Sequence, residues 1–232
     1  MTTLKHAICR RSPWVLSDLS SWQSVIDDLR IKPCTLKGAT MLYNEGDSLG
    51  KVFLIESGRV NLFVADEKGN EKSVFVLGTG CIFGEIALLG EDVARTSAIT
   101  ASSAVLYEIP GDYIVERLKT DLALNQAIIR SLLKKIDLLT SQVEFICFYD
   151  SSYRVTENIY HMIGQFGKQD EDGGILIETR FTHQEMANLV GATRVTVNNA
   201  FLKMEREGLL EKRKNRVYVK DLKRLEDQIR KA

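Results

Sequence analysis

Apolar residues recur at alternating steps of three and four between residues 125 and 146. This spacing predicts an amphipathic helix with one apolar stripe, because side chains three and four positions apart share a helix face. Leu133 and Leu138 lie beside the stripe, and Lys134, Lys135 and Asp137 lie away from it. The stripe itself consists of Ile129, Leu132, Ile136, Leu139, Val143 and Ile146.

The stripe fits two arrangements. It is either the seam of a short parallel coiled coil, and so the axis of a dimer, or the face by which the helix packs on its own domain. Three heptads are near the minimum for assigning a coiled coil, so spacing alone leaves both open. In a dimer, six side chains from each chain at about 1.5–3 kcal/mol apiece can outweigh an association cost of about 4–15 kcal/mol.

The pattern before this helix is different. Residues 16–29 have helical character, and short β-rich runs then alternate with glycine-containing turns such as Glu45-Gly46-Asp47 and Lys68-Gly69-Asn70. Short strands with frequent glycine turns are typical of a compact antiparallel barrel or jelly roll. The expected strands cover residues 40–43, 52–56, 59–64, 71–77, 98–100 and 104–109.

Two capped helices are predicted in the part of the chain after the long helix. Residues 151–163 have helical spacing, and a loop (168–174) and a β-like run (175–181) follow. Thr182 and Glu185 form a capping box that starts a helix ending at Gly191. Thr193 caps a second helix, 194–206, and two helices joined across a glycine indicate a helix-turn-helix.

A basic hairpin follows the second helix. Residues 209–212 and 216–220 are expected to be two strands around a turn at Lys214-Asn215, and they form a wing. The expected fold is therefore α+β, with an N-terminal antiparallel β-roll, a long dimerisation helix and a C-terminal winged helix-turn-helix. We expect three parts, residues 1–111, 112–148 and 149–232.

Composition adds an uneven charge. The chain has 232 residues with zero net charge, 44% hydrophobic and 27% charged, as in ordinary globular proteins. Residues 182–220 nevertheless hold eight Lys or Arg against four Glu, a net of +4, so the remainder sums to −4. A basic module on an acidic body points to nucleic acid, although a solvated charged face would look similar.

The sequence also bears on location and on chemistry. No apolar run approaches the roughly 18 residues that cross a bilayer, and the N-terminus lacks a signal peptide's apolar core, so we expect a cytoplasmic protein without a membrane partner. Cys9, Cys34, Cys81 and Cys147 form no CxxC pair and are interpreted as small, mostly buried side chains. No catalytic constellation appears, so an enzyme is not expected.

The roll is expected to bind a small molecule rather than a metal. The histidines, His6, His161 and His183, all lie outside the roll strands, which disfavours an iron or zinc enzyme, and no cofactor is predicted. Residues 83–98 contain side chains that suit a phosphorylated sugar rather than a metal. Glu85 opens a helical turn, and Arg95, ten residues later, precedes Thr96, so a carboxylate for sugar hydroxyls accompanies a guanidinium for a phosphate.

These residues resemble the cyclic-nucleotide-binding domain of the Crp/Fnr transcription regulators, and the resemblance covers about residues 29–219. It implies that Glu85 holds the ribose 2′-hydroxyl and that Arg95 pairs with the cyclic phosphate beside Thr96. The adjacent Thr140 and Ser141 match the pair with which cyclic-AMP-responsive members reach the adenine, one for each subunit's ligand. The implied nucleotide-binding residues are Gly84, Glu85, Ile86, Arg95, Thr96, Thr140 and Ser141.

Each of these residues also has a structural interpretation. Glu85 can be a first-turn acidic residue, Arg95 a surface residue in a turn, and Thr140 a hydroxyl bonded back to a helix carbonyl. The chain departs from the family at Ala94, where a proline is common, so we expect a looser turn.

The resemblance places the second helix in a DNA major groove. Arg194 is suited to a guanine edge, Val195 to a thymine methyl and Asn199 to adenine, and the last two replace a Glu and an Arg of the cyclic-AMP-responsive members. We therefore expect a half-site rich in A and T. The candidate DNA-binding residues are Thr182, Gln184, Thr193, Arg194, Val195, Thr196, Asn198, Asn199, Lys203, Lys212, Arg213 and Lys214.

The expected function is that of a homodimeric, allosteric transcription regulator. The resemblance implies a palindromic operator on double-stranded DNA, with half-site centres about 10 base pairs apart, and RNA polymerase as a partner. The expected effector is cyclic AMP. The alternatives are the same architecture with a thiol switch, a small organic acid or no ligand, and a cyclic-nucleotide module that does not bind DNA.

Overall fold

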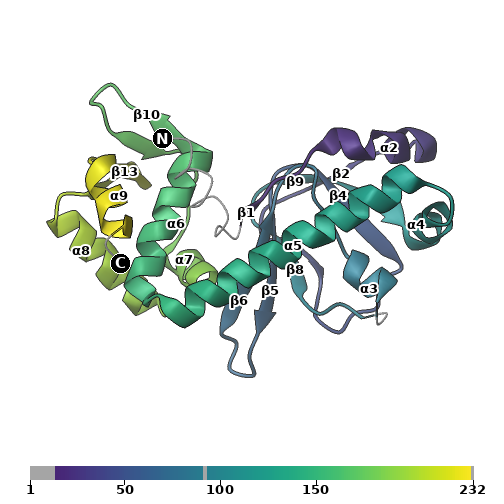
Figure 1. Cartoon of the computed structure of the whole chain (residues 1–232), viewed down its shortest axis with the longest axis horizontal. Helices are drawn as coiled ribbons and strands as arrows, with labels where there is room; N and C mark the ends of the chain where they lie inside the picture. The colour runs from purple at the N-terminus through teal and green to yellow at the C-terminus, as the bar shows by residue number, and fades with distance from the viewer. Residues whose placement is uncertain (1–13, 91–92, 231–232) are drawn as a thin grey trace. The chain divides into compact units, whose positions relative to one another are not determined.

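The computed structural model describes residues 14–90 and 93–230, which form two compact units (Figure 1). The first unit ends at Leu139 and the second begins at Thr140, so the long helix α5 (Leu122–Phe148) belongs to both. His6 and Cys9 lie outside the described residues.

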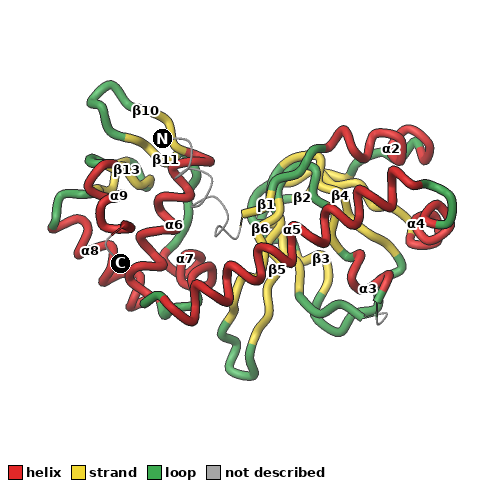
Figure 2. The backbone as a smooth tube through the Cα atoms, viewed as in Figure 1, coloured by secondary structure: helices red, strands yellow, loops and turns green. Residues whose placement is uncertain are grey.

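Short strands build a roll of two sheets in the first unit (Figure 2). One sheet has the order β1-β6-β5-β8-β3, and its strands are β1 (Trp14–Val15), β3 (Met41–Tyr43), β5 (Val60–Ala65), β6 (Glu71–Leu77) and β8 (Ser97–Thr100). The other has the order β2-β9-β4-β7, and its strands are β2 (Cys34–Leu36), β4 (Lys51–Ser57), β7 (Ile82–Phe83) and β9 (Ala104–Pro110). The pairs are antiparallel except for β1, which runs parallel to β6. The expected antiparallel roll is confirmed.

The inside of the roll is an apolar core with an aromatic group at its centre. Phe53 and Phe83 stack with ring centroids 4.9 Å apart, and the Tyr43 ring lies 6.0 Å from Phe53. Leu138 of α5 belongs to the same core and is one of the residues that attach the long helix to the roll.

Helices cover the roll outside this core. They are the 3-10 helix η1 (Leu19–Trp22), α2 (Gln23–Leu29), α3 (Glu85–Leu89), α4 (Gly111–Leu118) and the first part of α5. Asp121 starts α5, because its carboxylate accepts a hydrogen bond from the Leu124 amide at 3.0 Å. Leu124 and Ile128 of α5 join a second core with Trp22, Val52 and Ile114.

The predicted stripe of α5 remains on the surface of the chain. Ile129, Ile136 and Val143 are 54%, 58% and 62% exposed. Leu132 differs from the other stripe residues, because it is half-buried against the second core, whereas its neighbour Leu133 is exposed. The helix is thus apolar on two sides, with one side on the roll and the other uncovered.

The second unit is a small bundle of helices with a four-stranded sheet (Figures 1 and 2). Its sheet has the order β10-β11-β13-β12. Its elements after α5 are α6 (Ser151–Phe166), β10 (Gly167–Gln169), β11 (Ile175–Ile177), α7 (His183–Val190), α8 (Arg194–Arg206), β12 (Leu210–Arg213), β13 (Arg216–Val219) and α9 (Leu222–Arg230).

The wing is the hairpin β12–β13. Lys214 and Asn215 both have positive φ, 47° and 65°, which suits a two-residue turn between strands that pair Arg213 with Arg216. The expected winged helix-turn-helix is therefore confirmed. The four cysteines were expected to be mostly buried, but Cys147 is exposed.

Candidate functional site

Glu85 is buried inside the roll, with 1% of its surface exposed. It is the first residue of α3, and Gly84 before it has φ +88°. A side chain at Gly84 would be strained at this φ and would bring its Cβ within 3.3 Å of the Lys51 carbonyl. Gly84 therefore lets the chain turn sharply enough to direct Glu85 inward.

One oxygen of the Glu85 carboxylate is occupied and the other is not. Lys135 of α5 donates through Nζ to Glu85 Oε1, and the same ammonium donates to the Ile82 carbonyl at 2.9 Å. Glu85 Oε2 is buried and has no hydrogen-bond partner. A buried acceptor of this kind suits a ligand hydroxyl that completes its hydrogen bonding.

Tyr43 and Thr96 belong to the surroundings of Glu85. The Tyr43 hydroxyl shares a hydrogen bond with the Thr96 side chain, while burial, followed by the negative charge of Glu85, raises the pKa of Tyr43. Tyr43 is therefore a neutral phenol. Its aromatic ring, the Thr96 hydroxyl and the Glu85 carboxylate lie close together.

Arg95 and the turn before it lie at the edge of the roll. Arg95 is exposed and Thr96 is half-buried. Ala94 is buried; its amide donates to the Asp47 carbonyl at 2.9 Å, and its carbonyl accepts from the Gly46 amide at 2.8 Å. Both backbone groups of Ala94 are therefore hydrogen-bonded, and a proline could not donate the first bond, while the looser turn stays a prediction.

The remaining candidates for the nucleotide lie on two helices. Ile86 is exposed on α3, and Thr140 and Ser141 stand five and six residues after Lys135 on α5, exposed and half-buried respectively. Their role in binding stays a prediction.

The helix-turn-helix is bounded by the predicted caps. Thr182 accepts from the Glu185 amide at 3.1 Å and the Glu185 carboxylate accepts from the Thr182 amide at 2.6 Å, which completes the capping box. Gly191 ends α7 with φ 66°, and Thr193 caps α8 by accepting from the Thr196 amide at 3.1 Å. Both predicted helices and their caps are confirmed.

One side of α8 is exposed and mainly polar, and it also carries two large apolar side chains, Val195 at 67% exposure and Leu202 at 40%. The predicted contacts Arg194, Val195, Asn198, Asn199 and Lys203 are all exposed, whereas Thr196 is half-buried and shares a hydrogen bond with Thr193 at 2.8 Å. A groove of about 870 Å³ beside α8 is lined by five of the candidates, Thr182, Gln184, Arg194, Asn198 and Lys212.

His183 also lines this groove and stacks on Phe201, with ring centroids 4.8 Å apart. Burial, followed by the charges of Lys212 and Arg194, lowers the pKa of His183 below its usual 6.5. Lys212 and Arg194 therefore lie close enough to the imidazole to act on it, and cationic side chains beside a groove suit contact with a phosphate backbone.

Arg213 is engaged by acidic side chains of its own chain. Its guanidinium donates to Glu211 at 2.5 Å, Asp170 at 2.9 Å and Asp172 at 3.1 Å, and lies 3.5 Å from the centre of the Tyr218 ring. The hydrogen bond to Glu211, followed by that to Asp172, raises the pKa of Arg213. A side chain engaged by three carboxylates is poorly placed to hold a phosphate, so Lys212 and Lys214, both exposed, are the better wing candidates.

Arg154 was not predicted and connects the start of α6 with the helix-turn-helix. Its buried guanidinium donates to the carbonyls of Tyr149 at 2.8 Å, Val190 at 2.8 Å and Gly191 at 3.1 Å. It therefore ties the segment after α5 to the turn between α7 and α8.

Comparison with known proteins gives matches to both units. A family model described as a cyclic nucleotide-binding domain matches residues 33–121, and one described as a Crp-like helix-turn-helix domain matches residues 154–228. The "CRP-like cAMP-activated global transcriptional regulator" of Mycobacterium tuberculosis is 23% identical over 196 residues, 84% of this chain and 87% of the relative. The "Global nitrogen regulator" of Synechococcus elongatus is 26% identical over 185 residues, 79% of this chain and 82% of the relative.

A solved structure supports the same fold. The c-di-GMP responsive global regulator CLP of Xanthomonas campestris has a TM-score of 0.77 at 21% identity, and the match covers 88% of this chain and 100% of that one. At this identity the likeness shows the fold alone.

A cyclic nucleotide-binding roll followed by a Crp-like helix-turn-helix defines a class of protein, the DNA-binding transcription regulators. The chain belongs to the Crp/Fnr family of these regulators. Among residues 14–90 and 93–230, no helix is long and apolar enough to span a membrane.

Proposed function

We propose that the protein is a homodimeric regulator whose affinity for a palindromic operator is set by cyclic AMP bound beside Glu85. In this proposal residues 1–111 sense the effector, 112–148 dimerise and 149–232 bind DNA. RNA polymerase is the proposed partner at the promoter, on the strength of the relatives' role in transcription.

The observation that carries the proposal is the unpartnered Oε2 of Glu85 inside the roll. A polar atom that is buried without a partner destabilises the fold by about 1–3 kcal/mol, and a ribose 2′-hydroxyl would remove this penalty. Arg95, ten residues later, would pair with the cyclic phosphate next to Thr96, and Thr140 and Ser141 would contact the adenine.

The exposed stripe of α5 supports the dimer. A contiguous row of large apolar side chains on the surface is typical of an interface, and its spacing along a straight helix suits a parallel coiled coil. Leu132 contributes less to the proposed seam than Leu133, because it already packs on the roll.

Contacts of Arg154 support communication with DNA. Effector-dependent ordering of α5 near Val143 would alter the segment at Tyr149. Arg154 donates to the Tyr149 carbonyl and also to the carbonyls of Val190 and Gly191, so it links this segment to the helix-turn-helix. A change there would reposition α8. The ligand controls DNA binding only if it binds more tightly to one position of α8 than to the other.

Calorimetric titration of the nucleotide-free protein tests the effector. Cyclic AMP, cyclic GMP and cyclic di-GMP are the probes, since named relatives respond to different nucleotides. We expect cyclic AMP to bind at one site per subunit and Arg95→Ala to weaken it by at least tenfold, with the exposed Arg130→Ala as the matched control. An absence of binding by all three nucleotides would contradict the proposal.

A further inference from the structure

Lys135 occupies a position where an apolar side chain is expected. It lies on the face of α5 that packs on the roll, between Ile128 and Leu138, and is 4% exposed. Burying an ammonium is unfavourable unless the charge is paired, so a lysine at this position indicates a role beyond packing.

The partners of Lys135 define that role. Its ammonium donates to Glu85 Oε1 and to the Ile82 carbonyl at 2.9 Å, which fixes it to α3 and to β7. Glu85 is thereby held from one side only, and Oε2 is left without a partner at 1% exposure of the residue. Both charges of the pair are more than nine-tenths buried.

We propose that Lys135 is a specificity-determining positioning residue of the effector site, a role that rests on the proposed function. Lys135 offsets the charge of Glu85 and orients the carboxylate so that Oε2 accepts a hydrogen bond from an effector hydroxyl. The site therefore selects ligands with a sugar hydroxyl at this point over deoxy analogues. Lys135 is on α5, so the Glu85 carboxylate that would accept from the effector hydroxyl is also bonded to the long helix.

Two other roles of Lys135 predict different changes in effector affinity. If the ammonium competed with the effector for Glu85, its removal would tighten binding. If Lys135 only stabilised the fold, its removal would weaken binding of all ligands alike. A ratio of affinities for two ligands that differ by one hydroxyl separates these roles from positioning.

The experiment is calorimetric titration of the full chain with cyclic AMP and with 2′-deoxy cyclic AMP. We expect the wild type to prefer cyclic AMP by about 10- to 100-fold, as for a hydrogen bond to a charged group. Lys135→Met should weaken cyclic AMP binding and reduce the preference to about threefold or less, while Lys135→Arg keeps it. Lys134→Met, which removes an exposed ammonium one position away, should retain the wild-type preference.

A double variant covers the case in which Lys135→Met leaves a buried charge and does not fold. Glu85→Gln with Lys135→Met removes both buried charges, and Glu85→Gln, which keeps the ammonium, is compared with it. We expect both to bind the two nucleotides with the same small preference, because Lys135 acts through Glu85. A further loss of preference in the double variant would overturn the assignment.

The outcomes separate the two proposals. Wild-type preference that survives in Lys135→Met, or tighter binding by that variant, overturns the role of Lys135 alone. Binding of neither nucleotide by the wild type contradicts the proposed function, and the assignment of Lys135 fails with it.

Discussion

Arg194 is the first residue of α8 and is exposed in the groove beside it. We predict that Arg194→Ala reduces the preference for the selected operator over scrambled duplex by about 1–3 kcal/mol, because one bidentate base contact is worth that much. Anisotropy titrations with both duplexes measure it. Lys212→Ala, which removes a proposed phosphate contact, should weaken both equally; an equal loss in Arg194→Ala would refute base reading.

Asp121 should make the stability of the fold depend on pH. The Leu124 amide, and after it Arg117, lower the pKa of this carboxyl below its usual 3.8. A lowered pKa in the folded state means that stabilisation is fully present above pH 3.8 and is lost as the pH falls through the folded value. Asp121→Ala should therefore lower the thermal midpoint at neutral pH, and the difference from wild type should shrink in acid.

Asp121→Asn is the matched control, because it keeps a side-chain acceptor for the Leu124 amide and removes the charge. We expect its midpoint to lie between those of the wild type and Asp121→Ala. A difference between Asp121→Ala and wild type that is unchanged by acid would contradict the cap.

Sequence reasoning proposed Glu85 and Arg95 as site residues from their types and spacing, but it left Lys135 out. The partner of Lys135 lies 50 residues away in sequence, and no local pattern joins them. The only sequence signal was its helical register with Ile128 and Leu138, which places a charge on a buried face. The bond from Arg213 to Asp170 could not be predicted for the same reason, because the two residues are 43 positions apart.

At the scale of elements, local chemistry decided which segments could be predicted. Helices α7 and α8 were placed at their observed caps, since a capping box and a cap threonine are local signals. Strands β1, β2, β7 and β10 were missed because two or three residues contain little periodicity, and β10 lies partly in the predicted loop 168–174. Helices α4 and α9 were also missed. No capping pattern was recognised at the start of either helix, and α9 begins three residues after the last strand of the wing.

The uncovered stripe of α5 predicts an assembly. Ile129→Glu combined with Val143→Glu should convert a dimer to a monomer, because four carboxylates would then lie in an apolar seam. Sedimentation velocity at micromolar concentration measures the mass. Arg130→Glu, which places the same charge on the exposed surface of the same helix, should remain dimeric, and a dimer in the double variant would exclude this face as the seam.

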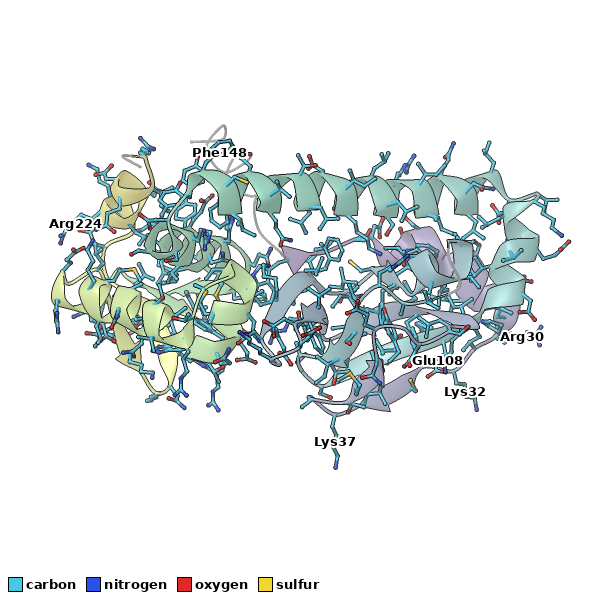
Figure 3. The ribbon with its side chains drawn as sticks, turned by 90° about the horizontal axis from the view of Figure 1, so that it is seen from below. Arg30, Lys32, Lys37, Glu108, Phe148 and Arg224 are labelled. Carbon is cyan, nitrogen blue, oxygen red and sulfur yellow. The ribbon has the colours of Figure 1, made fainter. Side chains whose placement is uncertain are left out.

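At the scale of the whole molecule, one helix belongs to the unit that holds the candidate effector site and to the unit that holds the helix-turn-helix. Phe148, the last residue of α5, is 79% exposed, and its side chain lies on the surface (Figure 3). The fold class could be predicted from the hydrophobic periodicity and the glycine-containing turns along the chain, because both depend on how each element is buried. The effector did not follow, because relatives with this fold respond to different signals.

The most direct test of effector control is the affinity for operator DNA with and without cyclic AMP. The duplex is selected from a random pool with the full chain, and anisotropy titrations are run for wild type and Arg95→Ala. We predict that saturating cyclic AMP changes the wild-type affinity by about 5- to 150-fold and leaves Arg95→Ala unchanged. If cyclic AMP binds the wild type but its DNA affinity is the same in both conditions, the effector does not control this regulator.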